Sequence, residues 1–157
     1  MGRKVELTRE VEAGVEALWN VMSKDRLKLL GKGPSPLLEE AKVLEGDGGL
    51  GTISYLKPGP AVSHIPPIKD KVVEFDDKEH VFSIQEIEGG YLDLGFSSVV
   101  LTFKLEGKEG GKTVVRSTIN TEFNEWFDGD ALVDELAKFV EIFINSAHSA
   151  LQESTVA

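Results

Sequence analysis

The chain of 157 residues contains no cysteine, which excludes disulfide bonds, thiolate metal sites and cysteine nucleophiles. Its histidines, His64, His80 and His148, lie far apart in the sequence, and no pair has the spacing of metal ligands. We therefore expect neither a metal site nor a cofactor. A protein that needs no oxidising compartment for disulfides fits a cytoplasmic location, which we predict here.

Basic residues and long apolar runs are also scarce. Lys and Arg number 17 against 27 Asp and Glu, a net charge of −10, and no basic cluster offsets the repulsion that nucleic-acid phosphates would meet. No segment reaches the roughly 18 consecutive apolar residues of a membrane-spanning helix, and the first residues contain no apolar signal segment. We predict no nucleic-acid or membrane partner. Apolar residues still make up 41% of the chain, enough for the core of one domain over residues 1–157.

Alternating polar and apolar residues, separated by short turns, predict an antiparallel meander of strands. The strands are expected over residues 4–11, 37–45, 51–56, 68–75, 81–87, 91–105 and 112–123. Between the first two, Val15, Leu18, Trp19 and Met22 follow helical spacing, and the pattern resumes towards Leu30, so two short helices are predicted. The Pro-rich residues 57–67 predict a surface loop.

The end of the chain has a different period. From Asp130 to about Leu151, apolar residues recur every three or four positions, which predicts an amphipathic helix of about 22 residues and about 33 Å. Asp128 or Asp130 would cap its start. A flat sheet would cover so long a helix poorly, whereas a curved sheet would bury its apolar face and leave room for a cavity between them.

Four features in this order resemble a known plant family. They are the terminal helix and the segments Glu16-Ala-Leu-Trp19, Glu45-Gly-Asp-Gly-Gly-Leu-Gly-Thr52 and Glu88-Gly-Gly-Tyr91. The combination is similar to the pathogenesis-related class ten proteins, the family of the major birch pollen allergen, over nearly the whole chain. The resemblance implies an α+β helix-grip fold: a seven-stranded antiparallel sheet wrapped around a long C-terminal helix, with two short helices and an internal hydrophobic cavity.

Two branches of that family resemble this chain. Ser23-Lys-Asp25, Glu74-Phe-Asp76 and Ile87-Glu-Gly-Gly-Tyr-Leu92 are similar to the phytohormone-binding proteins first described as cytokinin-specific binders. The run from Glu88 to Gly95 is also similar to norcoclaurine and norbelladine synthases, which condense an arylethylamine with an aldehyde.

The synthases share a Tyr, an acidic residue and a Lys, and their positions separate the two branches. Counted from the Glu-Gly-Gly-Tyr segment, the three fall on Ile68, Asp70 and Phe82, and a further synthase Asp falls on Leu101. Only the acidic residue is retained. Because Phe82 can neither donate nor accept the protons that the lysine handles, we do not expect norcoclaurine synthase activity.

In the binding branch, an acidic residue near Asp70 takes hydrogen bonds from the ligand and apolar side chains enclose the rest. Strand alternation and the family's wall positions then predict the ligand-binding residues. They are Met22, Arg26, Leu30, Leu56, Ile68, Asp70, Phe82, Ile84, Leu101, Phe103, Phe139 and Phe143. The alternative for Asp70 is a solvated strand aspartate paired with Lys69, Lys71 or Arg26.

These patterns lead to two functional hypotheses. The first is reversible binding of a small hydrophobic or aromatic plant metabolite, a cytokinin- or gibberellin-like phytohormone, with no catalytic residue and with a monomer or weak homodimer as the assembly. The alternative is an alkaloid-pathway enzyme of the norcoclaurine/norbelladine synthase-like branch that uses Asp70 as its acid/base.

Overall fold

One antiparallel sheet dominates the structure, a computed structural model that describes residues 2–30 and 38–156. Its seven strands are ordered β1-β7-β6-β5-β4-β3-β2, so strands β2 to β7 form a meander and β1 pairs with β7 at the far edge. The strands are β1 (Gly2–Val11), β2 (Leu38–Glu45), β3 (Ile53–Pro58), β4 (Ile68–Asp76), β5 (Val81–Gly89), β6 (Phe96–Lys108) and β7 (Lys112–Phe123).

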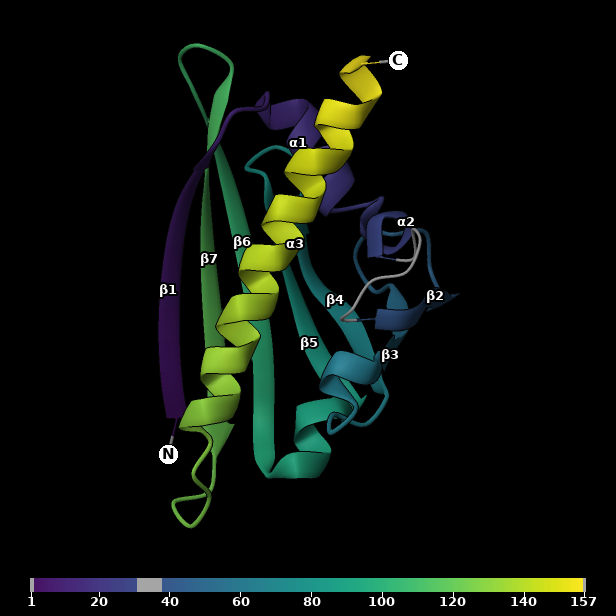
Figure 1. The fold of residues 1–157 in the computed structure, drawn as a ribbon, viewed down its shortest axis with the longest axis vertical. Helices are drawn as coiled ribbons and strands as arrows, with labels where there is room; N and C mark the ends of the chain where they lie inside the picture. Colours follow the sequence, from purple (N-terminus) through teal and green to yellow (C-terminus); the bar gives the residue numbers. More distant parts are fainter. Residues whose placement is uncertain (1, 31–37, 157) are drawn as a thin grey trace.

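Three α-helices and two short 3-10 helices accompany this sheet. Figure 1 shows α3 (Asp130–Val156) running along the sheet, with α1 (Val15–Met22) and α2 (Arg26–Leu30) beside its C-terminal half. The 3-10 helices are η1 (Pro60–Val62), between β3 and β4, and η2 (Gly90–Leu94), between β5 and β6. The predicted helix-grip fold, with a seven-stranded antiparallel sheet around a long helix, is confirmed.

The core lies between the sheet and α3. Alternate residues of β7, including Val115 and Ile119, are fully buried, as strand periodicity requires. Val133, Val140 and Ile144 of α3 face them at helical spacing and are at most 2% exposed. Burying each such side chain contributes roughly 1.5–3 kcal/mol, so this interface is a main source of the stability of the fold.

The terminal helix begins where the sequence predicted. The backbone N–H of Asp130 donates to Oδ1 of Asp128, at 3.3 Å, and the N–H of Val133 donates to the carbonyl of Gly129. The helix extends to Val156 rather than ending near Leu151.

The predicted strand over residues 91–105 differs most from the structure. It begins only at Phe96, because Gly90–Leu94 form η2. Gly89, Gly90 and Gly95 adopt φ values of 70°, 56° and 129°, which L side chains rarely adopt. The glycines therefore turn the chain out of the sheet where the apolar pattern alone predicted a strand.

Other boundaries differ by a few residues. The strand predicted from residue 37 is described from Leu38, and Leu37 lies outside the described residues. Strand β3 continues to Pro58, inside the segment predicted as a loop, and η1 lies in the remainder of that segment.

Candidate functional site

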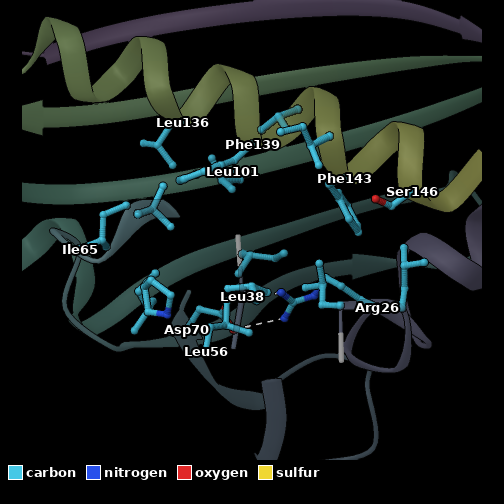
Figure 2. A pocket seen from close by; sticks show the side chains of 18 of the residues that line it. Arg26, Leu38, Leu56, Ile65, Asp70, Leu101, Leu136, Phe139, Phe143 and Ser146 are labelled. Atoms are coloured by element: carbon cyan, nitrogen blue, oxygen red, sulfur yellow. Dashed lines mark hydrogen bonds and ion pairs between the residues drawn. The ribbon is translucent and has the colours of Figure 1, made fainter. Parts of the chain in front are cut away.

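A cavity of about 550 Å³ lies between the sheet and α3. Small-molecule sites usually measure about 300–1,000 Å³. Residues from β2 to β6 form one wall and residues of α3 form the opposite wall. Helix α2, the segment between β3 and β4, and Tyr91 of η2 contribute the rest. In Figure 2, Phe139 and Phe143 project from α3 towards the side of the cavity where Arg26 and Asp70 meet.

Secondary-structure periodicity explains why these residues share the cavity. Ile68 and Asp70 are two apart on β4, and Leu101 and Phe103 are two apart on β6, so each pair points to the same face of the sheet. Helical spacing places the lining residues of α3 on the side of that helix that faces the sheet. Among these residues are the apolar Leu136, Phe139, Val140 and Phe143 and the polar Asn145, Ser146 and Ser149.

Most of the residues predicted as ligand contacts line this cavity. They are Arg26, Leu30, Leu56, Ile68, Asp70, Ile84, Leu101, Phe103, Phe139 and Phe143. The structure brings them together but holds no ligand, so their role in binding stays a prediction.

Met22 and Phe82 lie in the packed core beside the cavity and not among its lining residues. The ring of Phe82 stacks on Phe103 at a centroid distance of 5.0 Å and meets the edge of Trp19 at 5.7 Å. Strand parity places Phe82 on the cavity side of β5, but these two rings cover it. Met22 is buried completely within the same core.

Asp70 and Arg26 form an ion pair in the cavity wall. Arg26 Nη2 lies 3.2 Å from Oδ1 of Asp70, and Nη1 lies 3.3 Å from Oδ2. The two side chains are only 6% and 5% exposed. Asp70 is therefore not the solvated aspartate of the alternative prediction: it lines the cavity and pairs with Arg26, whereas Lys69 pairs with Glu88.

The sequence analysis missed a second cavity carboxyl group, that of Glu86. The Glu86 side chain lines the cavity, and Glu86 on β5 is the cross-strand partner of Asp70 on β4. Burial raises the pKa of Glu86 to about 8; the charges of Asp70 and Asp93 add to this rise, and the N–H groups of Tyr91 and Leu92 oppose it. Glu86 is therefore predominantly neutral at pH 7. A signal was present, because Glu86 follows Ile84 at the strand period of two.

Tyr91 connects the cavity wall to α3. Its hydroxyl group donates to Oε1 of Glu135 at 3.0 Å, and Nε2 of His64 lies 2.9 Å from Oε2 of the same carboxyl. Burial and the adjacent Glu135 charge raise the pKa of Tyr91, so its hydroxyl stays protonated and donates. The contacts of Tyr91 and His64 with Glu135 attach η2 and the segment after η1 to α3.

The chemistry available in the cavity is limited to enclosure, hydrogen bonding and proton transfer. Mostly apolar walls surround the Asp70 carboxylate, held by Arg26, and the neutral carboxyl group of Glu86. Further polar groups of the cavity wall belong to Tyr91, Asn145, Ser146 and Ser149. Within residues 2–30 and 38–156, no three His, Asp or Glu side chains are placed to hold a metal ion. No helix in the same ranges is long and apolar enough to cross a membrane.

Comparisons with known proteins agree with this fold. The family model described as polyketide cyclase/dehydrase and lipid transport matches residues 2–152. Norbelladine synthase of Narcissus pseudonarcissus is 32% identical over 78% of this chain and 77% of its own, and the Dau c 1.0401 isoallergen of Daucus carota is 33% identical over 84% and 81%.

Solved structures show the same fold. Norcoclaurine synthase of Thalictrum flavum, in complex with dopamine and hydroxybenzaldehyde, superposes with a TM-score of 0.82 at 24% identity, over 98% of this chain and 88% of that one. The chain therefore belongs to the polyketide cyclase/dehydrase and lipid transport family, in the group of plant pathogenesis-related class ten proteins that its motifs indicate.

Proposed function

We propose that this protein reversibly binds a small hydrophobic or aromatic plant metabolite, a cytokinin- or gibberellin-like phytohormone, inside the cavity. The observation that carries the proposal is an apolar cavity of about 550 Å³ with a buried ion pair in its wall. Asp70 orients the ligand, because its carboxylate accepts hydrogen bonds from a ligand N–H or O–H group.

The energetics support this function. A ligand that buries about 300 Å² of apolar surface gains roughly 7 kcal/mol at about 25 cal/mol per Å². A hydrogen bond to a charged group adds about 1.5–3 kcal/mol, and immobilisation of the ligand subtracts several kcal/mol. After the smallest such cost, about 4 kcal/mol, about 4.5–6 kcal/mol remain, which corresponds to a dissociation constant of tens to hundreds of micromolar.

A second candidate function is catalysis in the same cavity by Asp70 as acid/base. Two observations favour it: the 32% identity to norbelladine synthase, and the placement of two neighbouring carboxyl groups, one ionised and one neutral, in a single cavity. The aromatic core position of Phe82, where the synthases resemble one another in a lysine, favours binding over that condensation.

Native mass spectrometry distinguishes the two functions. The protein is incubated with a mixed panel of phytohormones and of arylethylamine–aldehyde pairs, and the supernatant is analysed for products. A retained, unmodified hormone supports the binding function. A condensation product that the Asp70→Asn variant no longer forms contradicts it and supports the enzyme.

The variants make this test specific. Asp70→Asn weakens binding in the first case and abolishes turnover in the second. Asp134→Asn is the matched control, because Asp134 is 65% exposed, pairs with Arg3 and is not among the residues that line the cavity. The control should behave as the wild type in both assays.

A further inference from the structure

Two neighbouring carboxyl groups belong to the polar part of the cavity wall, which also includes Arg26, Tyr91 and the α3 residues Asn145, Ser146 and Ser149. Asp70 on β4 and Glu86 on β5 are register partners, and both line the cavity. Cross-strand partners of an antiparallel sheet have Cβ atoms about 4.5–5.5 Å apart. A single ligand in the cavity can therefore reach both side chains.

The two groups have different partners. Both oxygens of Asp70 receive a hydrogen bond from Arg26. Within the described residues, the carboxyl group of Glu86 accepts hydrogen bonds only from backbone N–H groups of η2. One of them is the N–H of Tyr91, which donates to Oε1 at 2.9 Å. No cation of the described residues pairs with Glu86.

Gly90 shows how closely the carboxyl group of Glu86 is seated. A Cβ atom at this position would lie 2.6 Å from Oε1 of Glu86 and 2.7 Å from Cγ1 of Ile68. Only glycine therefore permits the turn that brings the N–H of Tyr91 onto Oε1. This arrangement fixes Oε1 of Glu86 against the backbone, while the Glu86 side chain lines the cavity.

Burial, with the charges around it, determines the protonation of Glu86. Asp70 on β4 and Asp93 in η2 oppose its ionisation. Arg26 of α2 is paired with Asp70, and on α3 Glu135 accepts the hydroxyl of Tyr91. With a pKa of about 8, Glu86 holds a proton at pH 7, and because Oε1 accepts N–H groups, that proton resides on Oε2.

We propose that Glu86 is a second polar anchor of the cavity, which donates a hydrogen bond to a ligand acceptor while the neighbouring Asp70 carboxylate accepts one from a ligand donor. The inference rests on the proposed binding function and specifies the ligand class. The site selects neutral aromatic molecules that present a donor beside an acceptor, as a cyclic amide or the N–H edge of a nitrogen heterocycle does. A ligand that lacks either group leaves a polar atom of the wall unpaired, which lowers its affinity.

Three tricyclic probes of similar size test this selectivity by fluorescence titration. Phenanthridinone carries an N–H donor beside a carbonyl acceptor, N-methylphenanthridinone carries the acceptor alone, and carbazole carries the donor alone. We expect the wild type at pH 6.5 to bind phenanthridinone about tenfold more tightly than either analogue, the ratio that one lost hydrogen bond produces.

The pH dependence isolates Glu86. At pH 9 a group with a pKa of about 8 is protonated in about one molecule in eleven, so the preference for phenanthridinone over carbazole should fall about tenfold. Carbazole serves as the internal reference for every other effect of pH. The Glu86→Gln variant, whose amide donates at both pH values and still accepts the η2 N–H groups, should keep the preference at pH 9.

Glu88→Gln is the matched control, since Glu88 lies two residues away, pairs with Lys69 and is 68% exposed; it should follow the wild type. Two results would overturn the role of Glu86 without affecting the binding function. One is a wild-type preference for phenanthridinone that is equal at both pH values, and the other is a Glu86→Gln variant that loses the preference at pH 9 as the wild type does. If none of the three probes binds while a hormone of the panel does, this inference fails and the binding function stands; if neither the probes nor the hormones bind, both fail.

Discussion

The ion pair between Arg26 and Asp70 allows a quantitative prediction about stability. Both side chains are almost completely buried, and two N–O contacts of 3.2 and 3.3 Å join them. Arg26 is also the only buried residue of α2, so this contact attaches α2 to the sheet. We expect the Arg26→Met variant to lose stability, because it leaves the Asp70 carboxylate buried without a counter-ion.

The size of the effect follows from the burial. Removing one partner of a buried pair costs about 3–5 kcal/mol. Asp70 borders the cavity and is not enclosed by packed side chains on every side, so we place the cost of Arg26→Met at the lower end of this range, near 3 kcal/mol. The double variant Arg26→Met/Asp70→Leu removes both charges and should lie within about 1 kcal/mol of the wild type.

Urea denaturation of the four members of this double-mutant cycle measures the coupling. With a slope of about 2 kcal/mol per molar urea, a loss of about 3 kcal/mol lowers the midpoint by about 1.5 M. The control Lys42→Met breaks the exposed pair with Glu40 and should change stability by less than about 1 kcal/mol. The reasoning is refuted if Arg26→Met costs no more than this control, or if the double variant is as unstable as the two single variants added together.

Three further predictions concern the cavity and its surroundings. Unfolded Glu86 ionises near pH 4.5 but folded Glu86 only near pH 8, so wild-type stability falls as pH rises between these values. Relative to the wild type, Glu86→Gln should gain nothing at pH 4 and on the order of 4 kcal/mol at pH 8 in urea denaturation, and a pH-independent difference would contradict this. Leu101→Trp should fill part of the cavity and weaken hormone binding at least tenfold by calorimetry, with an unchanged circular dichroism spectrum; unchanged affinity would argue against binding there. Tyr91→Phe removes the hydrogen bond to Glu135 and should cost about 1 kcal/mol, or about 3 °C in Tm by calorimetry, whereas a stabilised variant would contradict the contact.

Periodicity and motif order predicted much of the fold. The long helix from Asp130 and strand β7 over residues 112–123 carry uninterrupted apolar patterns, and tertiary packing follows the same pattern. Residues 91–95 were mispredicted as strand because their apolar residues alternate, whereas residues 91–94 belong to η2 and Gly95 adopts a positive φ angle of 129°. A local pattern cannot distinguish these two conformations when both bury the same side chains.

The site was less predictable, because it depends on contacts between distant segments. The sequence placed Phe82 on the cavity face of β5, but only the fold shows that Trp19 and Phe103 cover it. Arg26 and Asp70 are 44 residues apart, and nothing in the sequence chose Arg26 over the adjacent lysines. Glu86, in contrast, could have been predicted, because the same alternation that placed Ile84 in the wall also places Glu86 there.

The location of a bound hormone is the most direct test of the account. Methyl-group NMR of the protein titrated with the cytokinin trans-zeatin should give saturable shifts for Leu56, Ile84 and Leu101, which line the cavity. The exposed methyl groups of Leu44 and Leu50 should not shift. Shifts confined to those exposed groups, or no shift with any phytohormone of the panel, would contradict binding inside the cavity.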